Sequence, residues 1–185
     1  RVSGKPKSLG MTKATMKLLL IRHATRSLHG LGDVSLNSQG QRQAEYLAQM
    51  VSQGLLPTPS HLFSSPKKRA QETFASLSLS SQIPVKVDER LDERRQNESA
   101  QEFEARVRSF LDELTPDESG TPKFEGCAMI CSHLDWLELA MVLLPSTLSD
   151  LEMAASWSNA EYRLFRFNDG LWELMSGGIA EPREV

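Results

Sequence analysis

The sequence predicts an α/β fold, a three-layer sandwich with a mostly parallel central sheet flanked by helices. Two observations lead to this class. Short apolar runs alternate along the chain with longer segments whose apolar residues recur every three or four positions, the pattern of strands alternating with helices. Near the C-terminus, two strand candidates are separated only by Asn168-Asp169-Gly170, which predicts an antiparallel hairpin at one side of the sheet.

Four short runs are predicted to form the parallel strands: Met16–Ile21, His61–Ser64, Pro84–Val87 and Cys127–Cys131. The first and the last are apolar throughout, as expected for strands that are covered on both faces. Cys127 and Cys131 are expected to be core thiols on one face of their strand, because side chains alternate between faces with a period of two. The hairpin is predicted from Tyr162–Phe167 and Leu171–Met175.

Helices are predicted between these strands, at Ser38–Gln53, Lys67–Leu77, Ser99–Leu114 and His133–Leu144. Asn37 or Ser38 can cap the first helix, because both side chains accept backbone N–H groups. Pro66 is expected at the first position of the second helix, where a missing N–H costs nothing. The segments Asp88–Gln96 and Thr115–Phe124 are predicted to be loops.

The 185 residues fit one domain, which we expect at residues 16–176. Residues 1–15 are rich in Gly, Ser, Pro and Lys and predict a flexible tail that can include vector-derived residues. Residues 177–185 begin with Gly-Gly and predict a C-terminal tail.

The charge balance and the apolar runs restrict the partners. A net charge of −3 provides no general basic field for nucleic acid, and the longest apolar runs are too short to cross a bilayer. The two cysteines exclude a disulfide scaffold. No nucleic acid or membrane partner is expected, and residues 1–17 lack an apolar signal segment, so we expect a cytoplasmic location.

Polar residues follow three of the four parallel strands, at the edge where open α/β sheets bind ligands. Arg22 and His23 follow the first strand, Arg69 follows the second within Ser64–Arg69, and His133 follows the fourth. An imidazole can attack phosphorus and carry the phosphoryl group, and guanidinium groups match phosphate oxygens. A second, protonated imidazole would add positive charge. The pattern therefore predicts phosphoryl transfer.

The same residues lie in segments that resemble the histidine phosphatase superfamily, the phosphoglycerate-mutase-like enzymes. The resemblance runs from Met16 to about Met175 and rests on Arg22-His23, Asp33–Ala44, Ser64-Ser65-Pro66 with Arg69-Ala70 and Thr73, Leu91-Asp92-Glu93, Glu102–Val107 and Ser132-His133. It implies that His23 is the nucleophile, that Arg22, Arg69 and His133 bind the phosphate, and that Glu93 is the general acid. No metal or organic cofactor is implied.

The chain departs from the family pattern in two places. Ala24 stands where glycine is usual, and His29 stands where asparagine is usual. Only a short segment separates Glu93 from the next predicted helix, which predicts a small lid and argues against a dedicated phosphoglycerate mutase. These features favour a compact phosphatase that acts on a small phosphorylated substrate or a phosphoprotein.

Several alternatives remain open at this stage. Glu89 and Glu98 lie close enough in sequence to Glu93 to serve as the acid instead. A protein phosphohistidine phosphatase would need the acid less, because its leaving group departs easily. A non-catalytic phosphate-binding scaffold would keep the pocket without turnover. A zinc site built from His23, His133 and Asp33 lacks closely spaced ligands, and the arginines would repel the cation.

Overall fold

The structure is a computed structural model that describes residues 15–29, 32–116 and 121–182. Within this described part, six strands form one sheet in the order β3-β2-β4-β1-β5-β6. The strands are β1 (Met16–Arg22), β2 (His61–Ser64), β3 (Val85–Val87), β4 (Gly126–Ser132), β5 (Glu161–Asn168) and β6 (Leu171–Ile179). The pairings among β1 to β4 are parallel, whereas β5 pairs antiparallel with both β1 and β6. The predicted mostly parallel sheet with a terminal hairpin is confirmed.

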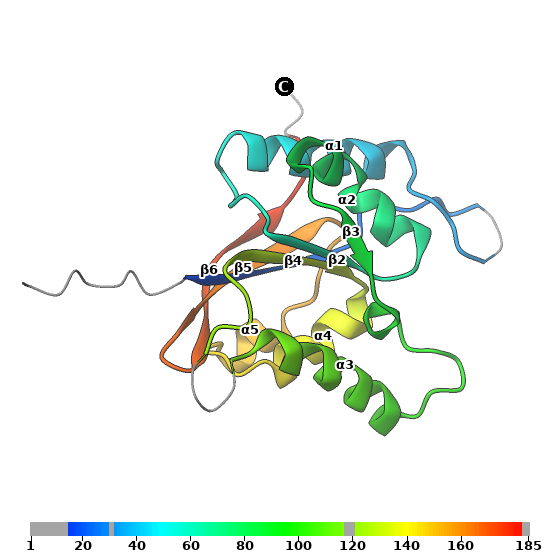
Figure 1. The fold of residues 1–185 in the computed structure, drawn as a ribbon. Helices are drawn as coiled ribbons and strands as arrows, with labels where there is room; N and C mark the ends of the chain where they lie inside the picture. Colours follow the sequence, from blue (N-terminus) through cyan, green and yellow to red (C-terminus); the bar gives the residue numbers. More distant parts are fainter. Residues whose placement is uncertain (1–14, 30–31, 117–120, 183–185) are drawn as a thin grey trace, which may run out of the picture.

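Helices cover both faces of the sheet and make the predicted three layers (Figure 1). On one face lie α1 (Ser38–Ser52) and α2 (Lys68–Ser81), and on the other lie α3 (Ala100–Leu114), α4 (Leu134–Leu143) and α5 (Asp150–Ala154). The chain moves outward from β1 to β2 and β3 through α1 and α2, then returns through α3 to β4. Because parallel crossovers are right-handed, this reversal of direction places α3 on the opposite face.

The strand β1 shows why the sheet is apolar on both faces. Leu19 and Ile21 pack with α1 and α2, whereas Leu18 and Leu20 pack with α3 and α4. In β4, Cys127 and Cys131 both lie on the α1 side, where they are buried and free of any disulfide, as predicted.

Some predicted boundaries differ from the observed ones. The helix α2 continues to Ser81, beyond the predicted end at Leu77, and its N-cap is Lys67, so Pro66 precedes the helix rather than opening it. The segment predicted as a loop from Asp88 contains a short 3-10 helix, η1 (Glu89–Leu91). The helix α5 was not predicted, although Ser149 and Glu152 form a capping box at its start.

The predicted C-terminal tail is wrong for its first residues. The strand β6 continues through Gly177 and Gly178 to Ile179, and the buried Ala180 donates its N–H to the Ala160 carbonyl at 2.9 Å. A Cβ at either glycine would stand 3.2 Å from an atom of Tyr162. The Gly-Gly pair therefore permits close packing within the sheet. The predicted tail residues 1–14 and 183–185 lie outside the described residues.

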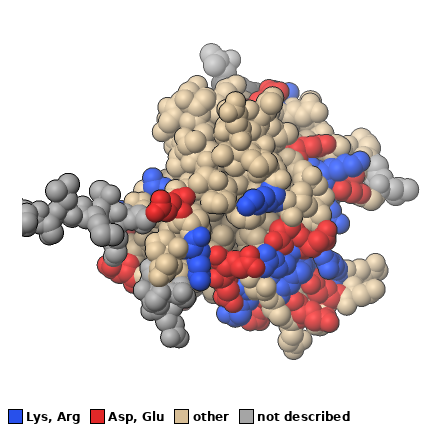
Figure 2. All heavy atoms as spheres, viewed as in Figure 1, with Lys and Arg blue, Asp and Glu red and all other residues tan. Residues whose placement is uncertain are grey.

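Charged side chains gather over α3 and the loop before it, whereas the opposite half of this face, over α1, carries few (Figure 2). In the described part of the chain, no helix has both the length and the apolar character needed to cross a membrane. The expected cytoplasmic location and the expected lack of nucleic-acid and membrane partners stay predictions.

Candidate active site

The three strands predicted to present the site end at the same edge of the sheet. Arg22 pairs in register with Ser132, and the His23 N–H donates to the Ser132 carbonyl at 3.0 Å. Next to them, the Ser65 N–H donates to the Cys131 carbonyl at 3.1 Å. These pairings bring the ends of β1, β2 and β4 together, as the sequence predicts.

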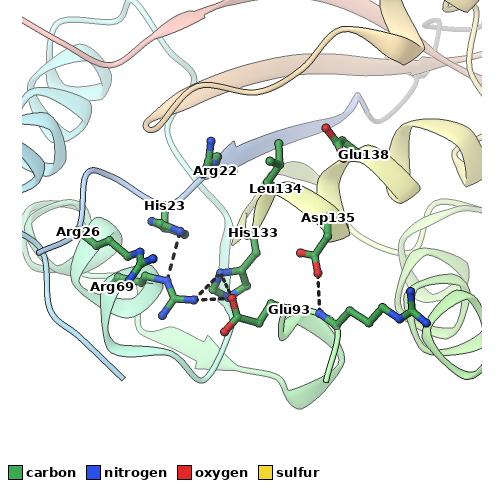
Figure 3. A pocket seen from close by; sticks show the side chains of 10 residues that line it. Arg22, His23, Arg26, Arg69, Glu93, His133, Leu134, Asp135 and Glu138 are labelled. Atoms are coloured by element: carbon green, nitrogen blue, oxygen red, sulfur yellow. Dashed lines mark hydrogen bonds and ion pairs between the residues drawn. The ribbon is translucent and has the colours of Figure 1, made fainter. Parts of the chain in front are cut away.

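A cavity of about 350 Å³ opens at this edge and contains all the predicted site residues. Arg22, His23, Arg69, Glu93 and His133 line it (Figure 3). The structure thus confirms that they lie together; their roles in a reaction stay predictions.

His23 is held in one tautomer. Its Nδ1 lies 2.8 Å from the Ala24 carbonyl oxygen, and because that oxygen can only accept, Nδ1 must carry the proton. Its Nε2 is therefore unprotonated, and its lone pair accepts a hydrogen bond from Arg69 Nε at 3.2 Å. The side chain is only 5% exposed, and burial, followed by the positive charge of Arg69, lowers the pKa to about 4. His23 is neutral at neutral pH, as a nucleophile must be.

The loop after His23 is fixed by α1 and α2. The Ala24 N–H donates to Thr73 Oγ1 at 3.0 Å, and Thr25 donates from both its N–H and its hydroxyl to Gln43 Oε1 at 2.9 Å. Gly40 packs directly against the Thr25 backbone, with no room for a Cβ. The motif residues Gly40, Gln43 and Thr73 thus position the loop without reaching the cavity.

His133 is the N-cap residue of α4 and is 2% exposed. Its Nδ1 lies 3.3 Å from an Arg69 Nη2 that can only donate, so Nδ1 accepts and Nε2 donates to Ser65 Oγ at 2.7 Å. Burial, with a further contribution from the Arg69 charge, lowers the pKa to about 2. His133 is therefore neutral in the site without an anion, and its protonation beside a bound phosphate stays a prediction.

The two arginines approach the cavity from different elements. Arg69, in the first turn of α2, is 5% exposed and makes its closest ion pair, at 2.7 Å, with Glu93. Arg22 donates from Nη1 to the Trp157 carbonyl at 2.6 Å. Its Nε is buried and has no hydrogen-bond partner among the described residues, and burial lowers its pKa. The cavity therefore has guanidinium groups able to receive an anion.

The position of Trp157 depends on a third arginine, which the sequence did not single out. Arg163 of β5 lies over the Trp157 ring, 4.0 Å from its centroid, and donates to the Glu152 and Ala155 carbonyls. The backbone that orients Arg22 is thereby fixed to the sheet.

Of the three carboxylates considered for the general acid, Glu93 alone lines the cavity. Its side chain is 42% exposed and contacts Arg69. Glu98 pairs instead with Arg106 at 2.6 Å, and this hydrogen bond lowers its pKa to about 2. Glu89 pairs with Arg95 at 3.1 Å. The geometry favours Glu93 over both reserves.

Sequence reasoning missed five residues that also line the cavity: Arg26, Arg94, Leu134, Asp135 and Glu138. The last three occupy the first turns of α4, directly after His133, and this proximity in sequence was the available signal. Asp33, considered for a zinc site, instead accepts the Lys68 N–H with both oxygens at 3.0 Å. Across residues 15–29, 32–116 and 121–182, no three His, Cys, Asp or Glu side chains are grouped as a metal site requires.

Fold and site together define an α/β domain with a cationic, histidine-containing cavity at the carboxyl ends of its parallel strands. Residues 18–97 match the family model of the histidine phosphatase superfamily, branch 1. This segment includes His23, Arg69 and Glu93 but ends before His133. Over these residues the chain is similar to the histidine phosphatase superfamily.

Solved structures share the fold. A candidate alpha-ribazole-5'-P phosphatase from Escherichia coli superposes with a TM-score of 0.72 at 18% identity, covering 90% of this chain and 98% of that one. The protein histidine phosphatase SixA, complexed with tungstate, gives 0.64 at 16% identity, with 89% and 97% covered. A mycobacterial glucosyl-3-phosphoglycerate phosphatase with inorganic phosphate gives 0.65 at 20% identity, with 90% and 99% covered.

At such low identities the similarity shows a shared fold. The phosphoglycerate-mutase-like fold predicted from the sequence is confirmed. No curated protein matches the sequence.

Proposed function

We propose that the chain is a metal-independent phosphatase that hydrolyses a phosphomonoester through a covalent phosphohistidine on His23. The observation that carries this proposal is the state of the imidazole. Its Nδ1 proton is engaged by the Ala24 carbonyl, and its unprotonated Nε2 lies beside Arg69. A neutral imidazole held in this way is prepared to attack phosphorus.

In the first half-reaction, His23 Nε2 forms a bond to phosphorus while the bond from phosphorus to the leaving oxygen breaks. Arg22 and Arg69 bind the equatorial oxygens and spread their charge. Glu93 gives its proton to the leaving oxygen, which departs as an alcohol.

In the second half-reaction, water attacks the phosphorus of phosphohistidine and Glu93 accepts one proton from it. The bond between His23 Nε2 and phosphorus breaks, inorganic phosphate leaves, and the lone pair returns to Nε2. The same carboxyl group is then protonated again for the next cycle.

Phosphate binding must rearrange the ion pairs of the free site. Glu93 and His133 Nδ1 both occupy the Arg69 guanidinium when no anion is present. An incoming phosphate takes their place, so Glu93 is released toward the leaving group and takes up from solvent the proton that it gives to the leaving oxygen. His133 Nδ1 then becomes free to bind a proton and to donate to the dianion.

The similarity of residues 18–97 to the histidine phosphatase family model and the fold shared with two phosphatases and a candidate phosphatase support this proposal. The short segment between Glu93 and α3 supports hydrolysis over mutase activity, because little chain is available to close the cavity over a reaction intermediate.

The first experiment tests the nucleophile by rapid mixing with p-nitrophenyl phosphate. The native protein should turn over and, after an alkaline quench, carry acid-labile phosphate. His23→Ala should abolish both signals. His29→Ala is the matched control, because His29 is exposed on the same loop and does not line the cavity. Turnover that survives in His23→Ala contradicts the mechanism, and absence of turnover in the native protein favours the scaffold alternative.

The second experiment tests the acid with single-turnover rates of Glu93→Gln and the exposed control Glu89→Gln. We expect Glu93→Gln to slow alkyl phosphate cleavage by about 10²–10⁴-fold and p-nitrophenyl phosphate cleavage much less, because nitrophenolate leaves without a proton. Equal losses for both substrates would assign Glu93 a structural role. No loss for either, together with faster turnover of phosphohistidine peptides, would favour the protein phosphohistidine phosphatase alternative.

A further inference from the structure

The cavity has two chemically different sides. Arg22, Arg26 and Arg69 come from β1, the loop after it and α2. The other side is formed by the first turns of α4, where Leu134, Asp135 and Glu138 line the cavity. We call these three residues the α4 wall. In Figure 3 the α4 wall and His23 lie on opposite sides of His133.

The leaving group must lie on the side of the α4 wall. In phosphoryl transfer the attacking and leaving atoms are roughly in line on either side of phosphorus. With His23 Nε2 attacking from one side, the leaving oxygen points away from it, toward Glu93 and the α4 wall.

The α4 wall carries two carboxylates that form no ion pair among the described residues. The Asp135 oxygens accept the Arg94 and Trp136 N–H groups at 2.7 and 2.9 Å, so its carboxylate is fixed in place by neutral donors. Glu138 is exposed and makes no ion pair among the described residues. Its charge acts on Arg22, where it partly opposes the lowering of the pKa by burial. Arg94 also lines the cavity, but its Nε donates to the Glu98 carbonyl at 3.1 Å and it forms no ion pair with Asp135 or Glu138 among the described residues.

A bound phosphate changes this balance. Once the dianion engages Arg22 and Arg69, the charge of Glu138 is no longer offset by Arg22. An ammonium group on the leaving group would then be attracted to the α4 wall, and a carboxylate or second phosphate would be repelled.

We propose that the α4 wall selects phosphomonoesters whose leaving group bears a positive charge, as in phosphorylated amino alcohols, over esters with an anionic leaving group. This inference rests on the proposed phosphatase function and adds the class of substrate. Glu138 is the specificity-determining residue, since it is the exposed carboxylate of the α4 wall.

The test uses three esters with two-carbon leaving groups: phosphoethanolamine, ethyl phosphate and phosphoglycolate. These differ chiefly in the charge of the leaving group, which is positive, neutral and negative. We expect kcat/KM to fall in that order. Because the leaving alcohols also differ in acidity, the decisive quantity is the ratio of phosphoethanolamine to phosphoglycolate in the native protein and in variants.

Glu138→Gln should lower this ratio by about fivefold, the effect of one partly screened charge, and Glu138→Lys should lower it further. Glu45→Gln is the matched control, because Glu45 is exposed on α1 and lies outside the cavity; it should leave the ratio unchanged. A ratio that is the same in Glu138→Gln and the native protein overturns the proposal, as does a preference for phosphoglycolate in the native protein.

Failure of the two proposals can be told apart. If p-nitrophenyl phosphate is hydrolysed but the small esters are not, the esters are tested as inhibitors of that hydrolysis. The ratio of the inhibition constants of phosphoethanolamine and phosphoglycolate then decides the charge preference. If nothing is hydrolysed, the phosphatase proposal fails. Calorimetric dissociation constants for phosphoethanolamine and phosphoglycolate then still decide whether Glu138 selects by charge.

Discussion

Replacing Gly40 by alanine should disable the site while leaving the fold in place. Gly40 lies in α1 against the backbone of Thr25, two residues after His23. A Cβ there would overlap the Thr25 carbonyl oxygen and stand 2.9 Å from its carbon and 3.0 Å from its nitrogen. Carbon atoms in contact prefer about 3.5 Å or more, so the two backbones would have to separate by on the order of 1 Å.

The separation cannot be absorbed locally, because the Asn37 N–H donates to the Thr25 carbonyl at 3.0 Å and the Gly40 N–H donates to Asn37 Oδ1 at 2.8 Å. A misplacement of about 1 Å can cost about 10²-fold in rate, and we expect a loss of this size for phosphorylation of His23. Overpacking costs about 1–3 kcal/mol, and the higher helix propensity of alanine returns about 1 kcal/mol. The net loss of stability is therefore about 0–2 kcal/mol.

The assay is the single-turnover release of p-nitrophenol, with urea unfolding measured on the same samples. Gly54→Ala is the control: its φ of +73° imposes strain, but no atom lies within 4 Å of the added Cβ. It should lose about 1 kcal/mol of stability and keep its rate. A Gly40→Ala protein within twofold of the native rate, or an equal loss of rate in Gly54→Ala, would refute the reasoning.

Three further predictions concern protonation and packing. The folded-state pKa values of His23 and His133 are about 4 and about 2, below the value of about 6.5 in an unfolded chain. The unfolded state therefore binds more protons below pH 6.5, and the free energy of unfolding should fall as the pH is lowered from 6.5 to 4. In urea titrations a His23→Asn variant should lose less unfolding free energy over this range. An equal loss would contradict the low pKa of His23. Sulfate binding at pH 7 should take up protons, partly at His133. Because the buffer supplies these protons, the calorimetric binding enthalpy should depend on the buffer, and less so in His133→Asn. A binding enthalpy that is the same in every buffer would argue against protonation. Arg106→Met removes the partly buried pair with Glu98 and donations to the Arg90, Asp92 and Glu93 carbonyls, so it should cost about 2 kcal/mol of unfolding free energy. An unchanged urea midpoint would show that these contacts contribute nothing.

The strands and the gathering of the site could be predicted from the sequence because both depend on local patterns. Apolar runs in β1 and β4 identify strands covered on both faces, and parallel strands place whatever follows them at one edge. His23 and His133 were found by this rule alone. The short helix α5 escaped the same approach, because it has no buried residue and hence no amphipathic pattern.

Properties that depend on several distant elements could not be predicted. The neutral state of His133 results from burial and from the charge of Arg69 on another element, and neither is visible in a one-dimensional pattern. The predicted helix ended at Leu77, yet Ser80 and Ser81 both direct their hydroxyls to the Leu77 carbonyl and belong to α2. The acidic residues of α4 were missed because their relevance depends on how that helix faces the cavity.

The strand order has a consequence for synthesis of the chain. The two strands that pair with β1 are β4 and β5, which the ribosome adds only after residue 125. Until then β1 has no neighbour, and β2 can pair only with the short β3. A nascent or truncated chain that ends near residue 97 would expose the apolar faces and open edge of β1, which invites aggregation. The candidate active site therefore forms late, and chaperone protection of β1 would matter most before β4 emerges.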